Sequence, residues 1–325
     1  MTTLTEPTPL LRAALDSRGA VLARRHFLAI ILVVLCIVAR FSSDVFFTQG
    51  NILNVLNQAS VIGVLAIGMT FVVLTGGIDL SVGSMLAAVS VYMGLQHQAG
   101  SGALVMLGAA LIGGVALGAF NGLAVTVGRV VPFIATLAML SAARGLALTM
   151  NDAQPITITD DTIRDIGRER IFGVPLPVYV FAVMAVLGWL LLNRTTFGRH
   201  VVAIGGNAEA ARLSGIRVQR TQFLVYALSG LCVSVAAVLL TARLGSASPT
   251  VAGGYELDAI AAVVIGGTSL SGGRGTLEGS VIGVLLFNVL FNLFNLLNVS
   301  AHMQGVLKGV IILAAVVVQR RTGGK

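Results

Sequence analysis

Four asparagines recur on one face of a strongly apolar segment near the end of the chain, in the stretch LLFNVLFNLFNLLN. They are Asn288, Asn292, Asn295 and Asn298. At helical spacing they fall within an arc of about 120°. An amide facing lipid would lack hydrogen-bond partners, so this face is expected to point inward. Such asparagines either bond a neighbouring helix or line a polar path, where Phe291 would offer an apolar face, and Asn57 in an earlier apolar segment suits the same interior.

Asp79 lies in a glycine-rich stretch, GGIDLSVG at 76–83, which joins two apolar segments. Its carboxylate can cap the following helix, or it can act as a functional charge at a helix break, as in many transporters. We therefore count it among the candidate path residues, with both roles open. Arg144 and Lys308 lie within apolar segments and need a partner or a water-filled cavity. The sequence does not show which acid pairs with which base.

The residues that usually perform catalysis form no recognisable set. No His, Cys or carboxylate cluster has metal-ligand spacing, and no nucleophile motif appears, so neither a metal site nor an enzyme is expected. A phosphate-binding P-loop needs a lysine followed by Ser or Thr. Of the two lysines, Lys308 precedes Gly309 and Lys325 is the last residue printed. We expect no cofactor, and any ATP must be bound by another polypeptide.

The elements that position these residues are apolar. The chain is 56% hydrophobic and 10% charged, with a mean hydropathy of +0.94, which predicts an all-α, polytopic transmembrane helical bundle. Ten apolar segments can be marked, each a candidate crossing. They are 27–44, 53–74, 80–97, 103–127, 130–150, 176–192, 222–243, 257–270, 276–297 and 302–319. The segment 257–270 is short for a full crossing.

The positive charges predict the orientation. About ten crossings with both termini cytoplasmic place most arginines and lysines on the inside. This divides the chain into a cytoplasmic N-terminal tail, a transmembrane domain and a cytoplasmic C-terminal tail. They span 1–26, 27–319 and 320–325. Residues 151–175 become a periplasmic loop and 193–221 a cytoplasmic one. The net charge of +8 is scattered between apolar helices, so no nucleic-acid partner is expected.

The cytoplasmic loop 193–221 holds a predicted two-turn helix at 207–214. Gly205-Gly206 is expected to break the chain, and Asn207 is a suitable N-cap. Glu209 lies in the first turn, within reach of Arg212, and Gly215 suits the left-handed stop position. Two turns alone are unstable in water, so either a partner completes this helix or the segment is an incidental turn.

Three stretches in order resemble one known family. LTGGIDLSVGSMLA at 74–87, GGNAEAARLSGI at 205–216 and GYELDAIAAVVIGGTSLSGGRGT at 254–276 are similar to the permease subunits of ribose-type ATP-binding-cassette importers. The resemblance implies a multi-pass inner-membrane protein that carries a monosaccharide. It implies a second permease chain, a separate ATP-binding subunit and a periplasmic sugar-binding protein as partners.

The resemblance also assigns a role to the predicted short helix. In that family the matching segment is a coupling helix, which docks on the ATPase. The residues so assigned are Gly206, Asn207, Ala208, Glu209, Ala210, Ala211, Arg212, Leu213, Ser214 and Gly215. The alternative is a secondary transporter of a small polar solute, driven by an ion gradient, in which carboxylates such as Asp79 and Glu278 carry the coupled ion.

Overall fold

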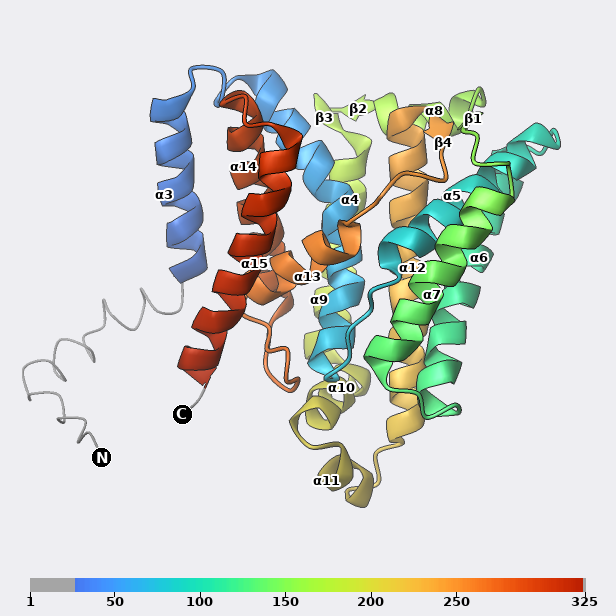
Figure 1. Cartoon of the computed structure of the whole chain (residues 1–325), viewed down its shortest axis with the longest axis vertical. Helices are drawn as coiled ribbons and strands as arrows, with labels where there is room; N and C mark the ends of the chain where they lie inside the picture. The colour runs from blue at the N-terminus through green and yellow to red at the C-terminus, as the bar shows by residue number, and fades with distance from the viewer. Residues whose placement is uncertain (1–26, 324–325) are drawn as a thin grey trace, which may run out of the picture.

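The computed structural model describes residues 27–323 and shows an all-α bundle (Figure 1). The predicted tail 1–26 and residues 324–325 lie outside this described part. The helices are α3 (Phe27–Ser42), α4 (Gln49–Leu74), α5 (Val82–Gln98), α6 (Ala103–Thr126), α7 (Pro132–Thr149), α8 (Asp161–Arg168), α9 (Leu176–Arg194), α10 (Thr196–Gly206), α11 (Ala208–Leu213), α12 (Val218–Leu244), α13 (Tyr255–Ile265), α14 (Leu277–Leu296) and α15 (Ala301–Gly323). The predicted all-α polytopic class is confirmed.

The predicted number of crossings is wrong. Among the described residues, six helices are long and apolar enough to cross a membrane: α4, α6, α7, α9, α12 and α14. The other four predicted crossings correspond to α3, α5, α13 and α15. Of these, α3 and the apolar part of α15, Ala301–Val317, are shorter apolar helices. An apolar segment of the sequence therefore does not always form a helix long enough to span a membrane in this protein.

Two of the four predicted crossings that the structure lacks are short helices, and each follows a stretch of non-helical chain. α5 has 17 residues and follows the non-helical stretch 75–81, whereas α13 has 11 residues and follows the stretch 245–254. Figure 1 shows α13 near mid-height, with the connecting chain running down to it beside α12. Gly245 and Gly254 take φ values of +64° and +84°, a conformation that glycine adopts without strain. The sequence predicts these stretches as connections, but hydropathy does not show that the helices after them are too short to cross.

The bundle is centred on α4 and α12. In α4, 83% of the apolar window is buried inside the molecule, against 22% in α6 and in α9, so α4 lies innermost. α12 approaches α6 closely through glycine. A Cβ added at Gly118 would lie 2.8 Å from the Cα of Gly230, which leaves no room for a side chain. This close contact fixes the position of α12, which begins shortly after α11.

Polar elements lie at the two ends of the bundle. One end carries α8, whose N-cap Asp160 accepts a 3.1 Å bond from the Ile163 amide. It also carries two short antiparallel pairs: β1 (Ile156–Thr157) with β4 (Ser246–Ala247), and β2 (Arg170–Ile171) with β3 (Val174–Pro175). α10 and α11 lie at the opposite end (Figure 1). The loops 151–175 and 193–221 therefore lie at opposite ends of the bundle; on which side of a membrane each lies stays a prediction.

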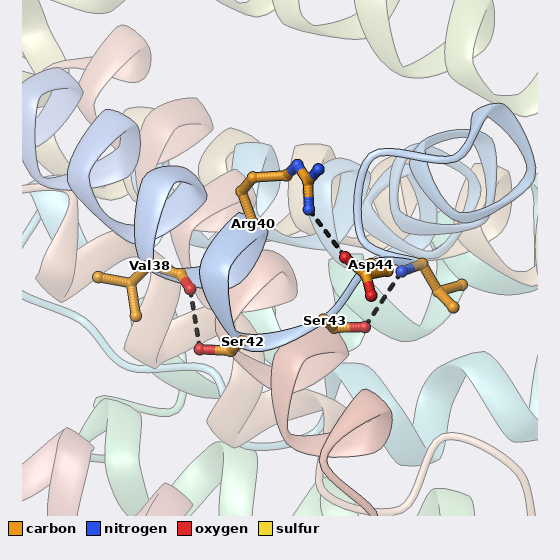
Figure 2. A network of polar contacts seen from close by, with 6 residues as sticks. Val38, Arg40, Ser42, Ser43 and Asp44 are labelled. Atoms are coloured by element: carbon orange, nitrogen blue, oxygen red, sulfur yellow. Dashed lines mark hydrogen bonds and ion pairs between the residues drawn. The ribbon is translucent and has the colours of Figure 1, made fainter.

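A compact polar turn closes α3 before α4 begins. Figure 2 shows the Ser42 hydroxyl donating to the Val38 carbonyl at 2.8 Å and Arg40 paired with Asp44 at 3.1 Å. The amide of Val45 donates to the Ser43 hydroxyl at 3.3 Å. These bonds satisfy groups that the end of a helix leaves free. Because Arg40 and Asp44 are exposed, their pair adds little stability.

Candidate functional site

α11 has the start and the stop that its sequence predicts. The Asn207 side chain accepts a 2.9 Å bond from the Ala210 amide, which caps the first turn. Gly215 takes φ +85°, and the Ile216 amide donates to the Ala211 carbonyl at 3.0 Å. The predicted short helix is therefore present. Its docking role is a separate matter and stays a prediction.

α11 stands out from the bundle with most of its surface free. Of its six residues only Ala211 is buried, while Leu213 is 76% exposed. Glu209 accepts two bonds from Arg212, at 2.6 and 3.1 Å, on the outer surface. The Arg212 guanidinium lowers the pKa of Glu209 below its ordinary value, first through the hydrogen bond and then through its charge. The helix therefore presents an exposed leucine and an organised ion pair on its outer surface.

The expected break at Gly205-Gly206 is wrong. The chain is helical from Thr196 to Gly206 as α10, and the interruption falls at Asn207, where φ is −161° and ψ is 104°. Position 205 requires glycine because there is no room for a side chain, and not because the backbone must bend there. A Cβ added at Gly205 would overlap the carbonyl oxygen of Leu74, the last residue of α4. α10 therefore packs its backbone directly on the end of α4.

The three stretches singled out in the sequence meet at this point. The Gly273 amide donates a 2.9 Å bond to the Leu74 carbonyl. A Cβ added at Gly272 would lie 2.9 Å from both the Gly205 carbonyl and the Gly76 amide. Gly76, Gly272 and Gly273 all have positive φ. We call Gly76, Gly205, Gly272 and Gly273 the glycine junction; it joins α10 by backbone contact to the chain that leads into α5 and out of α13.

The sequence analysis assigned Gly206 and Gly215 to the coupling segment but none of the four glycines of the glycine junction to the site. A signal was present, because each of the three stretches carries a Gly-Gly pair: 76–77, 205–206 and 272–273. The sequence does not show that these pairs lie together in space. A Cβ added at Gly206 would meet nothing within 4 Å, so its neighbour Gly205 is the residue that the packing requires.

Asp79 is buried completely within a network of neutral donors. Its Oδ1 accepts from the Ser81 amide at 3.0 Å and from the Ser81 hydroxyl at 2.5 Å, and its Oδ2 accepts from Ser229 at 3.0 Å. Asn121 donates to the Ser81 hydroxyl at 2.9 Å. The carboxylate thus ties the chain before α5 to α12, and Ser81 extends the network to α6. No side chain caps the first turn of α5, so both proposed roles of Asp79 stay predictions.

The asparagines of α14 are not gathered in one cavity. Asn292 is buried and exchanges two bonds with Asn51 of α4, at 2.8 and 3.0 Å. Asn288 donates to its own helix at Val284, and Asn295 accepts a 2.8 Å bond from Gln304 of α15. Asn292 thus bonds a neighbouring helix, which is the first of the two roles that the sequence left open for these asparagines. Its partner lies at the opposite end of α4 from the chain that carries Asp79.

Phe291 and Asn57 are each partly exposed. Phe291 packs between Phe287 and Phe294, at centroid distances of 4.5 and 5.6 Å, with the Lys308 ammonium 5.6 Å from its ring. The carbonyl of Asn57 accepts a 3.4 Å bond from Arg243. Among the predicted path residues, these two, like Asn288 and Asn295, have surface that a solute could reach, whereas Asp79 and Asn292 are buried.

The structure also pairs the charges that the sequence left open. Lys308 of α15 forms a 2.5 Å ion pair with Asp258 of α13. Arg144 of α7 donates to the carbonyls of Pro249 and Val251, at 2.6 and 3.1 Å. Both cations therefore hold α13 and the non-helical chain before it. Glu278 accepts a hydrogen bond from Trp189.

Comparison with known proteins identifies the family of this chain. Residues 51–316 match a family model described as "Branched-chain amino acid transport system / permease component". The chain is 44% identical over 304 residues to "Ribose import permease protein RbsC" of Escherichia coli strain K12, covering 92% of this chain and 94% of that relative.

Two further relatives extend the comparison. The Bacillus subtilis strain 168 "Ribose import permease protein RbsC" is 46% identical over 292 residues, covering 89% of this chain and 91% of that relative. The "L-arabinose transport system permease protein AraH" of Escherichia coli strain K12 is 37% identical over 261 residues, covering 80% of each chain. No solved structure matches. The chain therefore belongs to this permease family, as a ribose-type permease of ATP-binding-cassette importers and a membrane subunit of a transporter, not an enzyme.

Proposed function

We propose that this chain is the multi-pass permease subunit of a bacterial inner-membrane importer that carries a ribose-type pentose or hexose. ATP is hydrolysed by a separate subunit, and a periplasmic binding protein delivers the sugar. The description of the family model names branched-chain amino acids as the substrate, whereas the names of the relatives quoted above give ribose and arabinose. Identity above 40% over about nine-tenths of the chain favours the sugars.

One observation carries the proposal: α11 is exposed, and α10 beside it rests through backbone contacts on the glycine junction. A partner that displaces α11 would push α10 against the end of α4 and the loop after α13. Packed interfaces pass on such displacements because they have few intermediate arrangements. We infer that α11 docks on the ATP-binding subunit and that the glycine junction carries its movement to α5 and α13.

The solute path is inferred from non-helical backbone. In lipid, backbone groups outside a helix would lack partners, so such chain occurs only within protein or beside water. Residues 245–254 cross part of the bundle in this form, and Thr250 and Gly253 are exposed. We propose that a second permease chain faces this surface and that the sugar passes between the two chains. Asn57, Asn288, Phe291 and Asn295 stay candidates for the path.

An association experiment tests the docking of α11. Leu213→Asp would place a charge where the exposed leucine meets the ATP-binding subunit, whereas Leu213→Met keeps an apolar side chain of similar size. The ATP-binding subunit should co-purify with the wild type and with Leu213→Met but not with Leu213→Asp. Equal recovery with all three would refute the docking. Membrane insertion of each variant is checked by its level in the membrane fraction.

A further inference from the structure

A cavity of about 380 Å³ opens between the first turns of α10 and the start of α12. On the α10 side it is lined by Thr196 and His200, and on the α12 side by Arg217, Arg220, Thr221 and Leu224. The helices α9 and α12 are membrane-spanning by length and composition, and the cavity lies where α9 ends and α12 begins. It is therefore at the level of the lipid headgroups on the α11 side of the membrane.

The polar part of the cavity is positively charged and has no acidic residue in its lining. Arg217 and Arg220 are exposed, and neither forms an ion pair within the described part of the chain. Thr196 is the first residue of α10, an 11-residue helix, whose Gly198 amide is capped by the Thr195 hydroxyl at 3.3 Å. The amides of Thr196 and Phe197 also precede the first intrahelical bond, which runs from the Arg199 amide to the Thr195 carbonyl. Free amides at a helix start favour an anion, and arginine binds phosphate through several donors.

The cavity is also amphiphilic along the axis of α12. Arg217, Arg220 and Leu224 are spaced by three and four residues and so lie on one face. Leu224 is 41% exposed, and the same face continues toward the membrane interior with partly exposed Leu228 and Leu231. A ligand bound here would have its anionic group beside the arginines and an apolar chain along the leucines.

We propose that this cavity binds the phosphate of an anionic phospholipid from the membrane leaflet on the α11 side. A free phosphate would not use the leucines, and an acidic side chain of a partner protein would not extend toward the bilayer interior. Each arginine near an anionic membrane surface adds a modest attraction, so the two together should give a preference for anionic lipid of roughly 30-fold. The cavity borders the α11 segment: Gly215 lines it, and Arg217 and Arg220 also line a second cavity together with Glu209 and Arg212. It does not include the residues of the path proposed above.

Native mass spectrometry of the full-length chain in detergent tests this proposal, with phosphatidylglycerol and phosphatidylcholine titrated in parallel. The variant Arg217→Gln/Arg220→Gln removes both charges from the cavity. The control Arg129→Gln/Arg199→Gln removes two exposed charges outside the cavity lining. Circular dichroism and size-exclusion profiles check that both variants are folded. We expect the wild type and the control to prefer phosphatidylglycerol about 30-fold, and the cavity variant to lose most of that preference.

Two further arms identify the source of the phosphate. Inorganic phosphate and glycerol phosphate lack acyl chains and should not displace bound phosphatidylglycerol at millimolar concentration. Displacement would show a site for free phosphate and overturn the lipid proposal. An unchanged preference in Arg217→Gln/Arg220→Gln would also overturn it. If that variant kept its lipid preference but lost the ATP-binding subunit, the arginines would belong to the protein interface instead. Lipid binding is read without transport, so its failure is distinct from failure of the proposed function.

Discussion

The Gly273 amide donates a 2.9 Å hydrogen bond to the carbonyl oxygen of Leu74, which joins the loop after α13 to the end of α4. Gly205 of α10 lies against the same carbonyl, with no space for a Cβ. Three segments far apart in the sequence therefore share one backbone contact above α11. In the proposed function, this contact is the route by which a movement of α11 would reach both α5 and α13.

Gly205→Ala tests the glycine junction, and the adjacent Gly206→Ala is its control. The Cβ introduced at position 205 would overlap backbone, which cannot move aside as a flexible side chain can, whereas the Cβ at position 206 would meet open space. We expect Gly205→Ala to cost about 1–3 kcal/mol in stability and to abolish sugar uptake. Gly206→Ala should resemble the wild type in thermal unfolding and in uptake. Equal behaviour of the two variants would show that the junction is not tightly packed.

The junction also separates what the sequence predicts from what it does not. α11 could be predicted because Asn207, Glu209, Arg212 and Gly215 each act within a few residues of one another. The role of Gly205 could not, because a Gly-Gly pair that breaks a chain and one that permits close packing have the same sequence. Only the position of Leu74 and Gly273 in space distinguishes them.

The sequence located α5 and α13 approximately, at 80–97 and 257–270, and it marked 257–270 as short for a full crossing. It did not predict that 80–97 also forms a helix too short to be a crossing, because hydropathy does not record where the backbone leaves the helix. The pairing of Lys308 with Asp258 is a tertiary contact between α15 and α13, so no local pattern indicates it. The face of α14 was predicted to be inward, and Asn292 does bond α4 there, but Asn288 and Asn295 bond elsewhere.

The ion pair between Lys308 and Asp258 gives a second prediction. Lys308→Met leaves Asp258, whose side chain is 11% exposed, without its cation, which should lower stability by about 3–5 kcal/mol. Adding Asp258→Asn removes the unpaired charge and should restore much of the loss. Thermal unfolding of the detergent-purified variants measures both effects. A double variant no more stable than Lys308→Met alone would show that the two residues do not interact in the folded protein.

Arg144 gives a third prediction, about the non-helical chain. Its guanidinium binds the carbonyls of Pro249 and Val251, so Arg144→Gln should release residues 249–252. Hydrogen exchange at the amides of this segment should become faster, while exchange in the buried centre of α4 should not change. Unchanged exchange at 249–252 would mean that other contacts hold the segment.

The pKa of Glu209 gives a fourth prediction. Arg212 lowers this pKa, so the pair stabilises α11 above the ordinary carboxylate pKa, and the stabilisation is lost as the pH falls through the lowered value. A ¹³C-glutamate NMR titration should therefore find Glu209 titrating below its ordinary value. In Arg212→Gln the pKa of Glu209 should rise toward that value, and in the control Arg199→Gln it should stay low. The same pKa in wild type and Arg212→Gln would disprove the pairing.

The central claim is that this chain forms a path for sugar and depends on a separate ATP-binding subunit to drive transport. The most direct measurement is the initial rate of ribose uptake into proteoliposomes, with the chain alone and with its ATP-binding subunit and binding protein added. We expect ATP-dependent uptake only when all three components are present, and its loss with Leu213→Asp. Accumulation of ribose by the chain alone, driven by an ion gradient, would contradict the account.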